Sequence, residues 1–429
     1  MFSHRIYLDY ASLTPIDGRV LREMRKYSSM KYANPSSWHR EGVSAKNAIN
    51  DGRKRVADFI HAHLDEIVFT GGGTEANNLA LAGPIEYAHS KGIEYKDMHV
   101  LVSEIEHSSI LECTAELKRR GVQVDFIGVD SSGVVKLDDL KKKIRANTVV
   151  VSVMAVNNET GVVQPIREIA KIVRHFRNSL IEAHSRGQSR NEADTFPRDL
   201  AARGDSSRGK VVGEVNETVP VVKYPLFNTD ATQTACFQEL NVEQLGVDLL
   251  TLDGSKIYGP CGIGALYIRR NIPIEPIIFG GGQEKGMRSG TENIPTIMGF
   301  AKALQIIRNE QAEEIARVSE LRRHFILGLK SISPDIIVHG EGAETSPHIA
   351  NISIPGIDNE FFLLQLDAHG IACSTKSSCL RDADESYVLK AIGADSKTSI
   401  RFSFGRWTKK RHVRRVLKII KKLLLFKTA

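Results

Sequence analysis

Hydrophobic and polar positions follow two different patterns in the first and second parts of the chain. Up to about residue 270, short apolar runs alternate with helical patterns; the runs are "EIVFT", "HVLVSEI", "VQVDFIGVD", "TVVVSVMAV", "PLFNTDA", "VDLLTLDG" and "GIGALYI". Most of these runs lack the strict polar alternation of a strand with one wet face, so they predict strands that helices bury on both sides. The first part is therefore predicted to be an α/β domain with a mostly parallel sheet.

From about Ile272 onward the chain is dominated by long amphipathic helical patterns. Shorter strand patterns, "HIANISIPG" and "SIRFSFG", lie among them and indicate a smaller α+β domain. Residues 180–222 fit neither pattern, because they are polar at their centre and stand where a short helix-to-strand turn would suffice. We expect a flexible surface insertion without a catalytic part; a partner-binding arm is the alternative.

Charge is concentrated at the C-terminal end of the chain. The net charge is +7, but twelve Lys and Arg and no acid follow residue 395, which leaves 46 basic and 51 acidic residues in the remainder. There, "RRVLKIIKKLLLF" places Val416, Leu417, Ile420, Leu423 and Leu424 on one helical face. We expect a helix packed on the body with a solvated basic face and no direct nucleic-acid binding. A dock for tRNA, an acidic partner or an anionic membrane surface is the alternative.

Composition excludes several classes of protein. The 429 residues are 41% hydrophobic and 25% charged, as in an ordinary globular enzyme, and no apolar run approaches the ~20 residues of a spanning helix. The first residues lack the apolar core of a secretory signal, so we expect a cytoplasmic protein. Five cysteines without a CxxC pair argue against a disulfide framework and a structural zinc site, and no metal is expected.

A glycine turn between a strand and a helix is the first candidate for chemistry. In "IVFTGGGTEANNLALAG", Gly71, Gly72 and Gly73 let the backbone close around an anion. Thr74 and the first helical N–H groups can donate to that anion, and the helix dipole favours negative charge there. This pattern indicates a phosphate site; a turn that only connects two elements is the alternative.

Asp230 and Lys256 each follow an apolar strand, 26 residues apart. An Asp at a strand end is more often a helix cap, but the carboxyl edge of an α/β sheet is also where ligands bind. Pyridoxal phosphate requires a lysine for its aldehyde, a carboxylate for its ring nitrogen and a cradle for its phosphate. The four glycines around Lys256, in "DGSKIYGPCGIGA", would allow close backbone approach to such a ligand.

Ten motifs in order resemble those of the cysteine desulfurases, pyridoxal-phosphate enzymes of the aminotransferase class V group. They are "IYLDYASLTPID", "NPSSWHREG", "TGGGTEANNLAL", "EIEHSSIL", "VNNETGVVQPI", "DATQ", "SKIYGPCGIGALYI", "GGGQEKGMRSGTEN", "GIACSTKSSCL" and "SIRFSFGR". The resemblance runs from Ile6 to about Trp407. It implies a homodimer with the fold type I of pyridoxal-phosphate-dependent transferases: a large domain over 16–264 with a mostly parallel seven-stranded sheet, and a small domain of 1–15 plus 265–429.

The resemblance also implies roles around the cofactor. Lys256 matches the Schiff-base lysine, and His107 matches the histidine that stacks on the pyridine ring and serves as a plausible proton shuttle. Asp230 matches the partner of the ring nitrogen, and Gln233 matches the donor to the ring phenolate oxygen. Around the substrate, Asn34 and Asn158 match neighbouring groups, and Arg401 matches the fork that holds the α-carboxylate.

The predicted phosphate site departs from the resemblance at two positions. Thr74 matches a phosphate ligand, and Thr291 matches the threonine that reaches the phosphate of the other subunit. Related enzymes have a serine and a histidine where this chain has Asp253 and Ser255, and only Ser255 can still donate to the phosphate. A carboxylate beside a dianion is unfavourable. Asp253 therefore points away or is protonated, or Thr74, Thr291 and the helix terminus carry most of the binding; we expect weaker cofactor retention.

Cys379 matches the nucleophile that takes sulfur from the substrate. The surrounding "CSTKSSCLRDADES" is polar and lacks apolar periodicity, as expected of a mobile loop that visits both the cofactor and an acceptor. Lys376, which replaces the usual glycine, and Arg381 would favour the thiolate. Cysteines expected to fill apolar space instead are Cys236, Cys261 (where related enzymes have lysine) and Cys373.

The predicted function is conversion of L-cysteine to L-alanine, with sulfur passed as a Cys379 persulfide to an iron–sulfur scaffold or a tRNA-thiolation enzyme. The alternatives are a lyase or aminotransferase that acts on another amino acid, and a catalytically weakened sulfur-relay scaffold. The residues do not distinguish cysteine from selenocysteine as the substrate.

Overall fold

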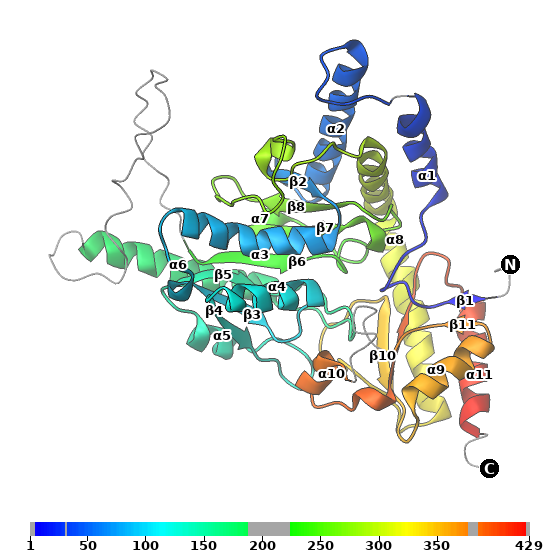
Figure 1. Cartoon of the computed structure of the whole chain (residues 1–429). Helices are drawn as coiled ribbons and strands as arrows, with labels where there is room; N and C mark the ends of the chain where they lie inside the picture. Colours follow the sequence, from blue (N-terminus) through cyan, green and yellow to red (C-terminus); the bar gives the residue numbers. More distant parts are fainter. Residues whose placement is uncertain (1–4, 31, 188–223, 376–384, 426–429) are drawn as a thin grey trace, which may run out of the picture.

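The computed structural model describes residues 5–30, 32–187, 224–375 and 385–425 (Figure 1). Its largest sheet has seven strands: β2 (Ile67–Thr70), β3 (His99–Ser103), β4 (Gln123–Ile127), β5 (Thr148–Ser152), β6 (Leu226–Asp230), β7 (Leu249–Asp253) and β8 (Gly264–Ile268). The strands lie in the order β2-β8-β7-β6-β5-β3-β4. Strand β8 runs antiparallel to both of its neighbours, and the other pairs are parallel. The predicted mostly parallel seven-stranded sheet is confirmed.

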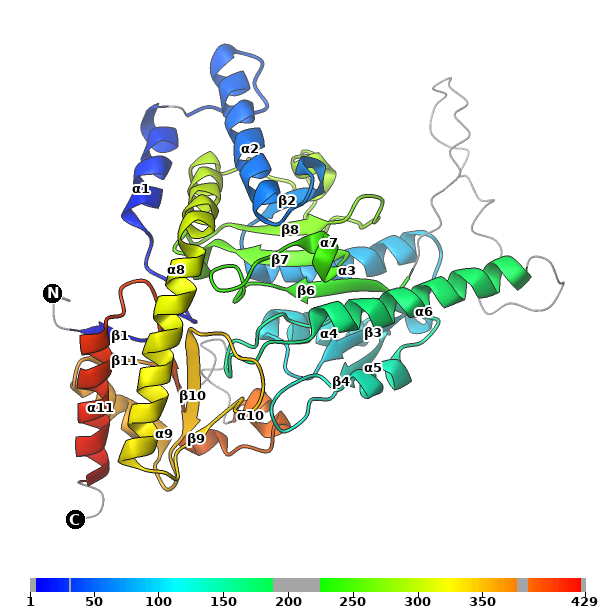
Figure 2. The ribbon, with the colours of Figure 1, turned by 180° about the vertical axis from the view of Figure 1, so that it is seen from behind.

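Helices cover both faces of this sheet, which is why its strands are so apolar. The helices that precede or alternate with the strands are α1 (Gly18–Arg25), α2 (Arg40–Phe59), α3 (Gly73–Ser90), α4 (Ser108–Arg119), α5 (Leu137–Lys143), α6 (Ile166–Gly187) and α7 (Val242–Leu245). Helices α3 and α4 lie on the face turned to the viewer in Figure 1, and α6 and α7 lie on the opposite face, seen in Figure 2. Every residue of β2, β3, β5 and β6 is buried, whereas the edge strand β4 is partly exposed.

A second, smaller set of elements packs beside the main sheet. It contains α8 (Ile294–Ile332), α9 (Asn359–Ala368), α10 (Tyr387–Ala391), α11 (Lys410–Leu425), β1 (Ile6–Tyr7), β9 (Ile337–Val338), β10 (Ile349–Ser353), β11 (Ile371–Ala372) and β12 (Ser399–Ser403). Strands β12, β10 and β9 form one antiparallel sheet, and β1 pairs in parallel with β11. The 39-residue helix α8 connects the two parts, because it contacts α1 and α2 near one end and α11 near the other (Figure 2).

Helix α11 confirms the expected amphipathic C-terminal helix. Val416 and Ile420 are buried, and Leu417 packs on the core. A Cβ atom on Gly328 of α8 would lie 2.3 Å from the Leu417 side chain, so this glycine allows the two helices to approach. None of the helices in the described ranges is both long and apolar enough to cross a membrane.

Residues 180–187 correct the predicted start of the insertion. They continue α6 as far as Gly187, because "LIEAHSR" contains no proline or glycine that would end a helix. The remaining part of the predicted insertion lies outside the described residues.

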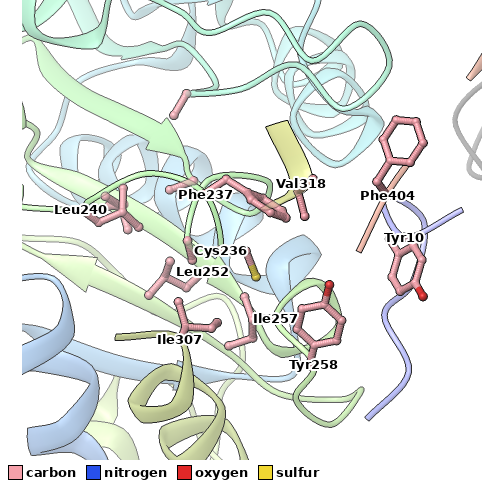
Figure 3. Packing of buried hydrophobic residues seen from close by; sticks show 14 of the residues in the cluster. Tyr10, Cys236, Phe237, Leu240, Leu252, Ile257, Tyr258, Ile307, Val318 and Phe404 are labelled. Carbon is pink, nitrogen blue, oxygen red and sulfur yellow. The ribbon is translucent and has the colours of Figure 1, made fainter. Parts of the chain in front are cut away.

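The segment that follows β7 is anchored in the hydrophobic core. Ile257 and Tyr258 are buried beside Cys236, and Tyr258 lies near Tyr10 with ring centroids 6.3 Å apart (Figure 3). The backbone on the C-terminal side of Lys256 is therefore held firmly, while the lysine itself is half-buried.

Candidate active site

The carboxyl edge of the main sheet collects most of the predicted residues. Strands β2, β3, β6 and β7 point the same way, so the glycine turn, His107, Asp230 and Asp253 all follow strands at this edge. A cavity of about 560 Å³ opens there, a volume typical of small-molecule sites. Its lining comprises Leu13, Gly71, Gly72, Gly73, Thr74, Glu75, Asn78, Asp253, Ser255, Cys261, Gly262 and Ile277.

The glycine turn forms one end of this cavity, where α3 begins. Gly72 has φ +147°, a region that favours glycine. A Cβ atom on Gly264 of the adjacent strand β8 would lie 2.7 Å from the Gly72 carbonyl carbon, so the strand and the turn meet backbone to backbone. Thr74 is exposed to the cavity, and Gly73 is buried with its N–H at the first turn of α3. This end has the features of an anion site.

Asp253 occupies that anion site. One oxygen, Oδ2, accepts a hydrogen bond from the Gly73 N–H at 2.8 Å, and the other, Oδ1, accepts from the Ser255 N–H at 2.6 Å and the Ser255 hydroxyl at 2.5 Å. The possibility that Asp253 points away from the turn is therefore wrong. As the N-cap of η5 (Gly254–Lys256), its carboxylate is drawn to the nearest N–H groups, and the α3 terminus supplies one of them.

Lys256 lies next to this carboxylate cluster. Its Nζ donates to the Ser255 hydroxyl at 3.2 Å, and its backbone oxygen faces the Cys236 sulfur at 3.6 Å. Lys256 also lines a second, very small cavity of about 10 Å³ together with Thr232 and Gln233. The predicted lysine is thus placed between the anion end and the residues that follow β6.

A buried polar chain forms the other end of the site. Asp230, 6% exposed, accepts from the Asn77 amide at 2.8 Å through Oδ2 and from the Thr232 N–H at 2.8 Å through Oδ1. The same Asn77 nitrogen donates to the Ser109 hydroxyl at 2.8 Å. The Asp230 carboxylate therefore accepts hydrogen bonds from two neutral donors.

His107 joins this chain through Ser109. Its Nδ1 lies 2.9 Å from the Ser109 hydroxyl and accepts from the Ser109 N–H at 3.2 Å, so His107 caps α4. Because Nδ1 is an acceptor, the proton of the neutral ring belongs on Nε2. Sequence reasoning missed Ser109 and Asn77; the only signal for Asn77 was a polar residue in the otherwise apolar run "NNLALAG".

Glu106 is a buried acid beside this chain that sequence reasoning also missed. Its Oε1 accepts from the Met154 N–H at 2.7 Å and from the Ser103 hydroxyl, whereas Oε2 has no partner among the described residues. Burial, reinforced by the charge of Asp230, raises the pKa of Glu106 to about 8. The carboxyl is therefore mostly neutral at pH 7.

Gln233 is held by contacts within the chain. Its amide nitrogen donates to the Ala11 carbonyl at 2.9 Å, and its Oε1 lies 3.1 Å from His348 Nε2. His348 stacks on Phe237, and burial lowers its pKa to about 3, so the ring is neutral and donates to Gln233. One hydrogen of the Gln233 amide remains for the role predicted for it.

Arg401 lies in the smaller part of the chain, on β12, and is 1% exposed. It donates to the Asn158 carbonyl at 2.7 Å, to Asp9 at 3.0 Å and to the Ser12 hydroxyl at 2.6 Å. Its Nε is buried and has no partner among the described residues. The structure thus brings Arg401 and Asn158 together, through the backbone of Asn158.

Asn34 and Thr291 are two predicted site residues that do not line the large cavity. Both are exposed, and within the described residues the lining of the large cavity includes neither. The Asn34 side chain accepts from the Ser36 N–H at 2.9 Å.

Burial disfavours the thiolate form in three of the four described cysteines. Burial raises the pKa of Cys236 and of Cys113 to about 12, and it also raises the pKa of Cys373. The packing role predicted for Cys261 is wrong: this side chain is exposed and lines the large cavity, because it sits on the turn before β8 and not in the strand. Cys379 lies outside the described residues, as do Lys376 and Arg381.

Comparisons with known proteins show the family of the chain. The aminotransferase class-V family matches residues 6–183 and 209–416. The chain is 35% identical to the cysteine desulfurase IscS of Dictyoglomus turgidum over 98% of its own length and 94% of the relative. It is also 35% identical to the mitosomal cysteine desulfurase of Trachipleistophora hominis, over 96% of the chain and 85% of the relative.

Two solved structures share the fold. A NifS-like protein, 30% identical, superimposes with a TM-score of 0.81 over 98% of this chain and all of its own. SspA, solved in complex with cysteine, is 29% identical, with a TM-score of 0.71 over 93% of this chain and 98% of its own.

Proposed function

The chain belongs to the aminotransferase class-V family, and from this premise we propose which residues perform each part of its reaction. The chain is a cysteine desulfurase, since relatives with that activity match it over nearly their whole length. The reaction converts L-cysteine to L-alanine and leaves the sulfur on an enzyme cysteine. Binding of cysteine by the similar protein SspA supports the choice of substrate.

Pyridoxal 5′-phosphate is the proposed cofactor, and the donors at the site fit it. The Thr232 hydroxyl is buried without a partner among the described residues, and it lies 3.2 Å from the position of a Cβ on Gly73. The Thr232 backbone N–H donates to Asp230, so this residue connects the anion end to the carboxylate end. When bound, the cofactor supplies an electron-withdrawing ring that stabilises negative charge on the substrate α-carbon.

Each end of the site has its own residues for this cofactor. Lys256 would hold the aldehyde, and Asp230 would keep the ring nitrogen protonated. His107 would cover the ring and move protons through Nε2, and Gln233 would donate to the ring oxygen. The phosphate would be held by the N–H and hydroxyl donors of Gly73, Thr74 and Ser255 and by Thr291 of a second copy of this chain. The observation that carries the proposal is the position of Lys256 between these two ends.

Arg401 is the proposed anchor for the substrate carboxylate. Its buried Nε retains an unused donor, and its other two nitrogens are fixed by Asn158, Asp9 and Ser12. A substrate carboxylate that binds this preorganised guanidinium would form charge-assisted hydrogen bonds, which are favourable in a buried site. Asn34 and the Asn158 side chain are proposed to contact the same substrate.

Cys379 is the proposed sulfur acceptor. Its thiolate would bond to the substrate sulfur as the substrate C–S bond breaks. The bonding electron pair would stay with the carbon, which takes up a proton to give alanine, and the persulfide would remain on the enzyme. An iron–sulfur scaffold or a tRNA-thiolation enzyme would then receive the sulfur.

We also propose a homodimer, and a small domain made of residues 1–15 and 265–429. The pairing of β1 with β11 supports that division.

Single-turnover sulfur transfer tests this assignment. The wild type loaded with pyridoxal phosphate should convert one equivalent of L-cysteine to alanine and protein-bound persulfide. Cys379→Ala should lose the persulfide, whereas Cys261→Ala, which removes the exposed thiol at the cavity, should keep it. Lys256→Ala should lose all turnover. Persulfide that survives in Cys379→Ala, or bound cofactor without alanine in the wild type, would reject the assignment.

A further inference from the structure

The anion end of the cavity already contains an anion that belongs to the chain. The Gly73 N–H, which points from the start of α3 toward the cavity, is used by Asp253 Oδ2, and both donors of Ser255 are used by Asp253 Oδ1. Three donors that would otherwise face a phosphate are thus committed to one carboxylate.

The rest of the cavity lining does not compensate for this negative charge. Two acids, Glu75 and Asp253, and no Lys, Arg or His are among the residues that line it in the described part of the chain. Glu75 is paired with Arg288 at 2.9 Å, which leaves Asp253 as the acid without a cationic partner in its hydrogen bonds. A dianion brought to this end meets a like charge at hydrogen-bond distance from its donors.

We propose that Asp253 is an internal competitor of the cofactor's phosphate and sets the affinity and selectivity of this site, an inference that rests on the proposed function. The phosphate binds only when the carboxylate leaves the Gly73 N–H. The site therefore gains little from the phosphate and discriminates weakly between pyridoxal phosphate and unphosphorylated pyridoxal. Asp253 acts here as a specificity-determining residue and has no part in bond making.

The test measures ligand binding without turnover. The full-length protein, stripped of cofactor, is titrated with pyridoxal phosphate and separately with pyridoxal, and binding is followed by the absorbance of the bound ligand. The variants are Asp253→Ser, which adds a donor, and Asp253→Asn, which removes the charge at nearly constant size. Asp65→Asn serves as a control, because it removes an acid that lies outside the cavity lining and is paired with Arg270.

We expect Asp253→Ser and Asp253→Asn to bind pyridoxal phosphate ~10- to 100-fold more tightly than the wild type, the range of one charge-assisted contact. Their affinity for pyridoxal should stay within about twofold of the wild type, which also shows that the site is folded. Asp65→Asn should leave both affinities unchanged.

Two results would overturn the inference while the proposed function stands. Pyridoxal phosphate could bind both Asp253 variants no more tightly than the wild type, or the gain could be equal for both ligands. If neither ligand binds the wild type or the variants in a Lys256-dependent manner, the proposed function itself fails and the inference fails with it.

Discussion

The two ends of the candidate site are both built around an aspartate, yet they differ in what surrounds it. Asp230 is buried and accepts from the Thr232 N–H and from Asn77 of α3, which in turn contacts Ser109 of α4. Asp253 lies at the mouth of the glycine turn and takes the donors of an anion site for itself. In the proposed assignment, the same side chain would thus support the protonated ring nitrogen at one end and oppose the phosphate at the other.

This difference shows that the charge of a residue decides its role only together with its partners. At Asp230, neutral hydrogen bonds stabilise an acid that, in the proposed assignment, would remain available to a protonated ring nitrogen. At Asp253, the acid satisfies backbone groups that are otherwise without a helical partner at the start of α3. Removing each acid should therefore have opposite consequences for the cofactor.

Loss of the Asp230 carboxylate is expected to have the largest effect. Asp230→Ala removes the charge that would keep the ring nitrogen protonated, so kcat for alanine formation should fall on the order of 100-fold or more. The measurement is steady-state alanine release at saturating L-cysteine, with bound cofactor quantified in parallel. An activity within about threefold of the wild type would show that Asp230 is only a structural acceptor for Asn77.

The buried acid beside this end gives a stability test. Glu106 has a folded-state pKa of about 8 against 4.5 when exposed, so the native protein binds the extra proton between these values and stability falls as pH rises toward 8. Glu106→Gln mimics the neutral form and should lose that slope. It should match the wild type near pH 5 and exceed it by ~4 kcal/mol near pH 9, because each pH unit between the two pKa values contributes about 1.4 kcal/mol.

Urea denaturation at the two pH values measures this difference. Glu116→Gln is a matched control, because Glu116 is an exposed acid on α4 that pairs with Arg119 and Arg120. Parallel pH curves for Glu106→Gln and the wild type would mean that Glu106 is ionised in the folded protein.

The smallest expected effect concerns Ser255 at the phosphate end. Ser255→Ala removes a hydroxyl that is a proposed phosphate donor once Asp253 releases it, so pyridoxal phosphate should bind roughly threefold to tenfold more weakly. The affinity for pyridoxal phosphate should thus change in the opposite direction from that expected for Asp253→Ser, and the same absorbance titration measures both changes. Tighter binding in Ser255→Ala would show that the whole Asp253 cluster, and not the carboxylate alone, opposes the phosphate.

The main sheet could be predicted because its signal is local. Seven apolar runs gave seven strands, and the amphipathic pattern near the C-terminus gave α11. The start of the insertion was misplaced because a polar composition does not end a helix that lacks glycine or proline. Cys261 was misassigned because a residue beside an apolar strand can still sit on an exposed turn.

The residues of the site also divide into those that the sequence identifies and those that it leaves unmarked. The motifs that name Lys256, His107, Asp230 and Arg401 stand in the sequence, and so does the departure at Asp253. Their supporting partners are marked weakly or not at all: Asn77 is a polar residue in an apolar run, Ser109 follows His107 by two positions, and nothing local marks His348. Such contacts depend on how helices and loops dock, which a pattern of hydrophobic positions leaves open.

The sequence by itself therefore determined the fold class, the family resemblance and the residue types at the site, because periodicity and motif order are properties of the chain alone. Only the tertiary structure decided where the Asp253 carboxylate goes. From the sequence alone, Asp253 could point away, be protonated, or leave the phosphate to Thr74, Thr291 and the helix terminus. The packing of β8 against the glycine turn brings β7 and α3 close enough for the Gly73 N–H to donate to its carboxylate. A hydrogen bond between residues 180 positions apart forms only when the fold places both partners within about 3 Å.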